Sequence, residues 1–175
     1  MRADGRRRAL AQGGFFLIEA MVAILIFALG ILGLVAMGGT AVSSQSDAQY
    51  RTEASSLADA IAGEVALGID RSSDANKAAS LLNFAHQATP TPATIPAPCA
   101  FSGGVINAAA APGVAALLNR AANLGPGVGL PGATAANQQI FIDAPGNFNR
   151  VVITLCWKTA SDSAWRRHTL VTYVN

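Results

Sequence analysis

An uncharged apolar stretch near the N-terminus constrains this chain more than any other feature. Residues 20–42 contain 23 consecutive positions without Asp, Glu, Lys or Arg. As an α-helix rising 1.5 Å per residue, they would extend about 34 Å, which is enough to cross the hydrocarbon core of a bilayer. The sequence therefore predicts one membrane-spanning helix.

A single carboxylate, Glu19, stands at the start of this stretch and is the only charge between Phe15 and Val42. On insertion scales a carboxylate at the centre of a membrane helix costs about 2.5–3.5 kcal/mol, and less toward an interface. An intramembrane charge of this kind marks a functional site with a partner group, so we expect Glu19 to find a cation.

The head that precedes the stretch is basic. It reads MRADGRRRALAQGG, with four arginines against one aspartate, and leaves eight basic and nine acidic residues for the remainder of the chain. The positive-inside rule places such a head in the cytoplasm and the residues after Ser43 outside. Because the basic pI of 8.8 comes from this head, bulk charge does not indicate a nucleic-acid partner.

Beyond the membrane stretch the helical pattern continues with one apolar face. Apolar residues recur at steps of three and four: Tyr50, Ala54, Leu57, Ile61, Val65 and Ile69. Proline is absent from residues 15–69, so one helix of about 50 residues is predicted, with a membrane half at 15–42, an amphipathic half at 43–70 and an end near Gly68.

The last third of the chain has strand character. Residues 138–143, 150–158 and 166–175 are rich in β-branched and aromatic residues and predict an antiparallel sheet. Alternation places Val151, Ile153, Leu155 and Trp157 on one face, which we expect the helical stripe to cover. Short helices are predicted near 78–84 and 114–124, and loops at 89–98 and 125–133. The expected fold is α+β: a long N-terminal helix packed on a small C-terminal antiparallel sheet, with residues 71–175 as the globular part.

Catalytic and metal-binding patterns are weak. Cys99 and Cys156 belong to no C-x-x-C pair; in an exported domain they are candidates for one disulfide, and a buried free thiol at Cys156 is the alternative. His86 and His168 have no Cys, Asp or Glu at ligand spacing. Trp157 and Trp165 flank a hairpin loop and are expected to pack across the strands. We therefore predict no enzyme, no cofactor and no metal.

The junction between head and helix carries a family resemblance. GG followed by FFLIEAMVAILIFALGILGL resembles the class III signal of type IV prepilins and pseudopilins, most closely that of minor pilins of the PilV type. The resemblance implies a prepilin peptidase cut between Gly14 and Phe15 and methylation of the new Phe15 amine. It also implies that Glu19 pairs with the N-terminal ammonium of a neighbouring subunit.

The same resemblance implies a function. A minor pilin of this kind is held in the inner membrane with its N-terminus in the cytoplasm and its C-terminal domain in the periplasm. It is then incorporated into a type IV pilus through helix contacts with other major and minor pilins, where it promotes assembly for adhesion or twitching motility. The alternative within the same superfamily is a minor pseudopilin of a type II secretion system.

Other readings are disfavoured by particular residues. A secretory signal peptide has an apolar region of 7–15 residues, shorter than residues 20–42. A twin-arginine signal lacks support because ALAQ, which follows the arginines, is not its usual hydrophobic pattern. A plain membrane anchor leaves Glu19 without a role. An adhesin or DNA receptor would depend on Arg166, Arg167 and the loops, and a solvated strand face is the simpler interpretation of those residues.

Overall fold

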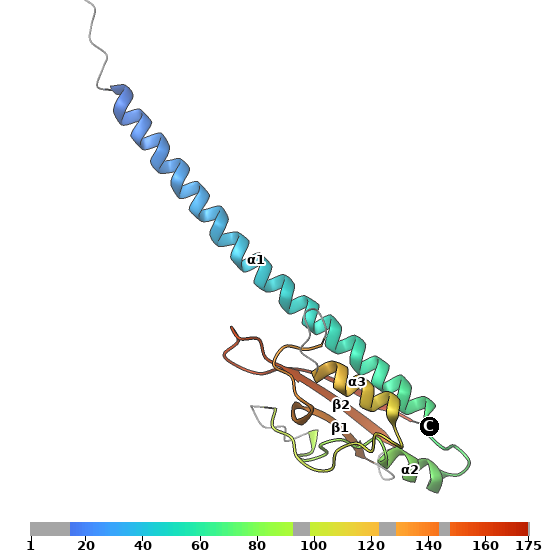
Figure 1. The fold of residues 1–175 in the computed structure, drawn as a ribbon. Coiled ribbons are helices and arrows are strands. Elements are labelled where there is room, and N and C mark those ends of the chain that lie inside the picture. Colours follow the sequence, from blue (N-terminus) through green and yellow to red (C-terminus); the bar gives the residue numbers. More distant parts are fainter. Residues whose placement is uncertain (1–14, 93–98, 123–128, 144–147, 175) are drawn as a thin grey trace, which may run out of the picture. The chain divides into compact units, whose positions relative to one another are not determined.

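The computed structural model describes residues 15–92, 99–122, 129–143 and 148–174 (Figure 1). Its elements are, in chain order, α1 Phe15–Leu67, α2 Asp74–Leu82, α3 Pro112–Ala122, the 3-10 turn η2 Ala135–Asn137, β1 Gln138–Asp143, β2 Arg150–Trp157 and β3 Arg166–Tyr173. The chain divides into two compact units, residues 1–47 and 48–175, and α1 contributes to both. The predicted α+β class, a long helix with a small antiparallel sheet, is confirmed.

Helix α1 extends over 53 residues because nothing in its sequence stops it before Gly68. It contains no proline, and hydroxyl side chains near its middle bond back to the helix itself: Thr40 Oγ1 donates to the Met37 carbonyl and Ser44 Oγ to the Thr40 carbonyl. These local hydrogen bonds satisfy polar groups without interrupting the helix.

The amphipathic half of α1 supplies one side of the main core. Its buried residues follow the predicted stripe: Ala54, Leu57, Ala58, Ile61 and Val65, with Ile69 just beyond the helix. Tyr50 is partly buried against the same cluster. Helix α3 adds Val114 and Leu118 to this core. In Figure 1, α3 and the C-terminal part of α1 lie on the same side of the sheet.

The sheet has three antiparallel strands in the order β1-β2-β3. Ile140 of β1 lies opposite Ile153 of β2, which lies opposite Leu170 of β3. Val151, Ile153, Leu155 and Trp157 of β2 all belong to the main core, as alternation predicts. The helical stripe therefore covers the sheet face that the sequence assigned to it.

The opposite face of β2 is also buried, which the sequence did not predict. Val152, Thr154 and Cys156 are each at most 2% exposed. The chain attached to the sheet at this face comprises residues 86–92 and 99–106, here called the covering segment. His86 forms a β-bridge with Ile140 of β1, and Cys99 is joined to Cys156 of β2 by a disulfide. The small sheet thus has a cover on both faces of its central strand.

The structure changes the start of one predicted helix. Helix α2 begins at Asp74, earlier than expected, because the Ser73 hydroxyl caps it by accepting the Asn76 N–H. Both tryptophans pack as expected: Trp157 lies in the main core, and Trp165, just before β3, packs against the disulfide cluster that includes Cys156 of β2. The predicted loops at 89–98 and 125–133 lie partly outside the described residues.

A turn before η2 requires glycine on two counts. Gly132 has φ +64°, in the left-handed region, and a Cβ at this position would lie 2.5 Å from the Lys158 carbonyl oxygen. The Lys158 N–H donates to the Pro131 carbonyl, so the turn is held against the end of β2.

We expect Gly132→Ala to lower the free energy of unfolding by about 2–3 kcal/mol, from backbone strain and the contact with Lys158. Denaturant titration followed by tryptophan fluorescence in detergent micelles measures this change. Gly104→Ala is the matched control, because a Cβ there meets nothing within 4 Å. Equal stability of the two variants would contradict the assignment of Gly132.

Candidate functional site

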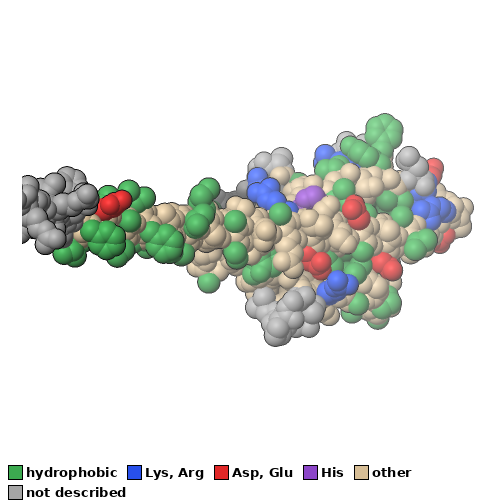
Figure 2. Space-filling view, turned by 90° about the horizontal axis from the view of Figure 1, so that it is seen from above, with side chains coloured by type: hydrophobic (Ala, Val, Ile, Leu, Met, Phe, Trp, Pro, Cys, Tyr) green, Lys and Arg blue, Asp and Glu red, His purple; other side chains and the backbone are tan. Residues whose placement is uncertain are grey.

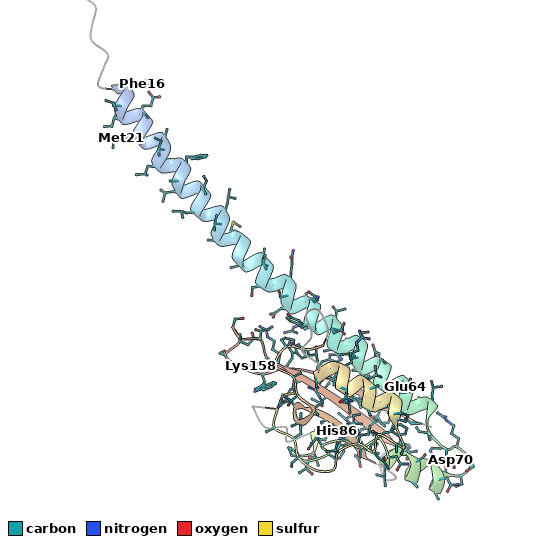
Figure 3. All side chains as sticks on the ribbon, viewed as in Figure 1. Phe16, Met21, Glu64, Asp70, His86 and Lys158 are labelled. Carbon is teal, nitrogen blue, oxygen red and sulfur yellow. A yellow bond between two sulfur atoms is a disulfide. The ribbon has the colours of Figure 1, made fainter. Side chains whose placement is uncertain are left out.

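The apolar half of α1 presents hydrophobic side chains on every side. Large apolar residues exposed here are Phe16, Leu17, Ile18, Met21, Val22, Ile24, Leu25, Ile26, Phe27, Leu29, Ile31, Leu32, Leu34, Val35, Met37 and Val42. Figure 2 shows hydrophobic side chains on the visible face of the helix, and Figure 3 shows Phe16 and Met21 projecting from its first turns. The most apolar window of α1 has a mean hydropathy of 2.8 and is not buried within the chain, so α1 is a candidate membrane span.

Nothing among the described residues covers this surface, so lipid or other protein has to supply the cover. Burying one large apolar side chain stabilises by about 1.5–3 kcal/mol, and a helix that is hydrophobic all round is found in a membrane or inside a larger core. Lipid and a bundle of similar helices both satisfy this requirement.

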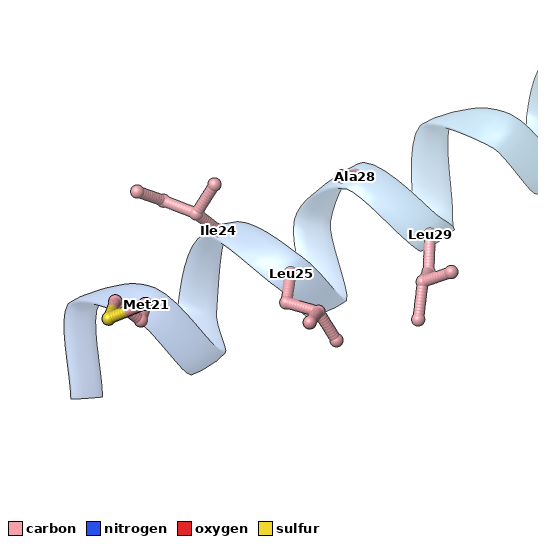
Figure 4. A pocket seen from close by; sticks show the side chains of 5 residues that line it. All are labelled: Met21, Ile24, Leu25, Ala28 and Leu29. Atoms are coloured by element: carbon pink, nitrogen blue, oxygen red, sulfur yellow. The ribbon is translucent and has the colours of Figure 1, made fainter. Parts of the chain in front are cut away.

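The surface of the apolar half of α1 is uneven because its residues differ in size. Met21, Ile24, Leu25, Ala28 and Leu29 line a shallow hollow on one side of the helix, with the small Ala28 between larger neighbours (Figure 4). At Gly30 and Gly33 an added Cβ would meet nothing within 4 Å. These glycines lower helix propensity by about 1 kcal/mol each, and packing among the described residues does not account for them.

The predicted assembly residues lie at the start of α1. The helix begins at Phe15, and Glu19 follows one turn later with an exposed side chain. Within the described residues, the Glu19 carboxylate makes neither a hydrogen bond nor an ion pair. The predicted cleavage residue Gly14 and the basic head lie outside the described residues. The structure therefore positions Glu19 on an otherwise uncharged helical surface.

The two predicted cysteines meet on the sheet. Cys99 and Cys156 form a disulfide with a Cα–Cα distance of 6.3 Å, and both residues are buried. Phe101 and the partly buried Trp165 pack around the bond. The disulfide fastens the covering segment to β2, which is a structural role.

Two glutamines hold the same region and were missed by sequence reasoning. The Gln138 side-chain amide donates to the Cys156 carbonyl at 3.0 Å and accepts the Cys156 N–H at 3.1 Å. Gln139 Nε2 donates to the carbonyls of Gln87 and Pro90 at 3.0 and 2.7 Å. The adjacent QQ at the start of a strand was the available signal, but its partners are distant in sequence.

His86 is a buried structural residue. Its Nε2 donates to the Ala135 carbonyl at 2.8 Å, and its Nδ1 accepts the Ile106 N–H at 3.2 Å, which assigns the neutral Nε2–H tautomer. Burial lowers the pKa of His86 below its usual 6.5, and the hydrogen bond to Ala135 opposes this only in part. With both ring nitrogens engaged by backbone groups, His86 is not placed to act as a general base.

The charged residues of the β2–β3 hairpin are mostly paired. Arg166 donates to Asp162 at 2.8 Å, and this hydrogen bond, followed by the Thr159 N–H, lowers the pKa of Asp162 to about 2. Arg167 is exposed and His168 is partly buried on β3. Nothing in this hairpin assembles a catalytic set.

Among the described residues, no three His, Cys, Asp or Glu side chains gather as a metal site. Comparison with family models, with curated proteins and with solved structures finds no significant match.

The neutral form of His86 makes stability depend on pH. Since the folded-state pKa is lowered, the unfolded chain binds more protons below pH 6.5, and the free energy of unfolding falls as pH drops from 6.5 toward the folded-state pKa. Carboxylates are still ionised down to about pH 5, so the interval above that isolates the histidine.

We expect His86→Gln to abolish most of this slope, and denaturant titrations at a series of pH values measure it. His168→Gln, which leaves His86 in place, serves as the control and should keep the native slope. The interpretation fails if the native chain is equally stable at both ends of the interval.

Proposed function

We propose that this chain is a minor subunit of a type IV pilus-like filament, made as a precursor in the inner membrane and assembled through α1. In this proposal the basic head is cytoplasmic, prepilin peptidase cuts between Gly14 and Phe15, and residues 48–175 are periplasmic before assembly.

One observation carries the proposal: Glu19 is the single charge on a helix surface that is apolar all round, four residues after the Gly14–Phe15 junction. A lipid bilayer satisfies the apolar side chains but offers the carboxylate no fixed cation. A bundle of like helices satisfies both needs, because the new N-terminal ammonium of one subunit lies at the level where a neighbour displaced along the bundle presents Glu19.

Such a pair acts mainly as a register device. Charges attract more strongly in an apolar interior than in water, but much of this gain is offset by desolvation. Removing one partner of a buried pair is nonetheless strongly destabilising, by about 3–5 kcal/mol, since it leaves an uncompensated charge. Helices in the wrong axial register suffer the same penalty.

The α+β body is consistent with this role. Its core uses the amphipathic half of α1, which leaves the apolar half free to contact lipid or other helices. The disulfide and the two-sided cover of β2 suit a small domain that functions outside the cytoplasm.

We expect Glu19→Ala to insert into the membrane normally but to enter filaments at least about tenfold less, because the neighbour's ammonium loses its counter-charge. Immunoblots of membrane and sheared-filament fractions measure the two populations. Glu19→Gln, which keeps the shape without the charge, should behave like Glu19→Ala.

Asp59→Ala is the matched control, since Asp59 is an exposed carboxylate on the amphipathic half of the same helix. It should enter filaments as the native chain does. Normal incorporation of Glu19→Ala would refute the pairing.

Processing is tested separately. Gly14→Val should leave the head attached, visible as a precursor mass, because a β-branched side chain hinders the close backbone approach that glycine allows at a scissile bond. The same change at Gly13 should still be cut. Mass spectrometry of the native chain should give a start at a methylated Phe15, and a mature chain that starts at Met1 or beyond Val42 would contradict the proposal.

A further inference from the structure

The two edges of the sheet differ. The outer edge of β1 is closed at its middle, where His86 N–H donates to the Ile140 carbonyl and Ile140 N–H donates to the His86 carbonyl. Among the described residues, β3 pairs with β2 alone. Its other edge therefore presents unpaired backbone donors and acceptors, which readily accept another strand.

The direction of each backbone group on β3 follows from the bonds around it. Ile140 is bonded outward to His86, and the backbone of Cys156 is bonded on the β1 side by Gln138. Backbone groups that point toward one neighbouring strand and toward the other alternate along an antiparallel strand. The backbone N–H and C=O of Ile153 therefore point toward β3, and those of its partner Leu170 point toward β2. The outward-facing residues of β3 are then Arg167, Thr169, Val171 and Tyr173.

The same four residues have exposed side chains. Val171 is 49% and Tyr173 55% exposed, and Arg167 and Thr169 are exposed as well. They lie on the sheet face whose central part is taken by the covering segment. β3 contains no proline, and only one of the four residues is charged. Proline and charged residues are the features that usually prevent an edge strand from pairing with another chain, so β3 has few of them.

The geometry points to the occupant of this edge: the β3 strand of a second copy of this chain, antiparallel, around a two-fold axis at Leu170. In this register all four outward-facing residues find partners, with Thr169 opposite Val171 and Arg167 opposite Tyr173 of the other copy. Each contact occurs twice, as an isologous interface requires, and a continuous six-stranded sheet results.

Complementarity selects this register. Arg over a tyrosine ring and Thr beside Val are both favourable cross-strand pairs. The two copies of Arg167 are separated by six residues of strand, about 20 Å, which exceeds the screening length of about 10 Å. Sliding the strands by two residues loses the Arg–Tyr pairs and shortens the ladder, and a parallel in-register pairing places Arg167 against Arg167.

This interface is independent of the proposed helix assembly, because β3 lies in the unit of residues 48–175. One strand edge buries little surface, so the dimer is weak in dilute solution. Because its two-fold axis is perpendicular to the sheet, the amphipathic halves of α1 in the two copies run in opposite directions, so this dimer is distinct from the parallel helix bundle of the proposed function.

The test is sedimentation equilibrium of the full chain in excess detergent micelles over a concentration series. The native chain should show a monomer–dimer equilibrium. Val171→Lys should raise the dimer dissociation constant about tenfold, because the two-fold symmetry places the substitution in the interface twice. Val105→Lys is the matched control, since Val105 is a 69% exposed valine outside β3, and it should leave the constant unchanged.

Substitutions of Tyr173 test the proposed register between the two β3 strands. Tyr173→Glu places a carboxylate opposite Arg167 of the other copy and should lower the dissociation constant, whereas Tyr173→Lys should raise it. Glu19→Ala should leave the constant unchanged, which separates this interface from α1. A chain that is monomeric throughout, a dimer indifferent to Val171→Lys, or the same effect from both Tyr173 variants would overturn the inference, as would β3 pairing only with a different protein.

Discussion

Packing of the α1 stripe against one face of β2 is the interaction on which the body of this protein depends. Ile61 and Ile153 are fully buried in the cluster that they share, and Trp157 is 1% exposed. Each such side chain contributes about 1.5–3 kcal/mol through the removal of apolar surface from water. Once α1 and α3 occupy this face, Val152 and Cys156 of β2 still lie on the second face of the sheet, where the covering segment accompanies their burial.

The second cover is built from irregular chain, so its backbone groups need partners that no helix or ladder provides. Polar side chains of the sheet and of the cover supply them: Gln139 donates to two carbonyls of the covering segment, and His86 binds the Ile106 N–H and the Ala135 carbonyl. Buried backbone polar groups left without partners are expensive, which explains why buried polar residues are concentrated here. The Cys99–Cys156 disulfide adds a covalent tie to the same cover.

The surfaces left open by this core are of two kinds. Among the described residues, the apolar half of α1 is uncovered and carries the isolated carboxylate of Glu19, and in the proposed function it packs against like helices. The free edge of β3 presents backbone hydrogen-bonding groups with self-complementary side chains. As proposed, the first surface is covered through the hydrophobic effect and one buried charge pair and the second through directional hydrogen bonds, so the two respond to different substitutions and conditions.

The sequence by itself determined the elements with strong local patterns. An apolar, proline-free run specifies α1 and its stripe, and alternating β-branched residues specify strands whose bounds, such as Gln138–Asp143, agree with the structure. Only the tertiary structure decided that both faces of β2 are buried, that Cys99 joins Cys156 and that His86 is a structural residue. The cysteines are 57 residues apart and the covering segment has no periodicity. Such contacts depend on which distant segments come together, and local propensity carries no information about that choice.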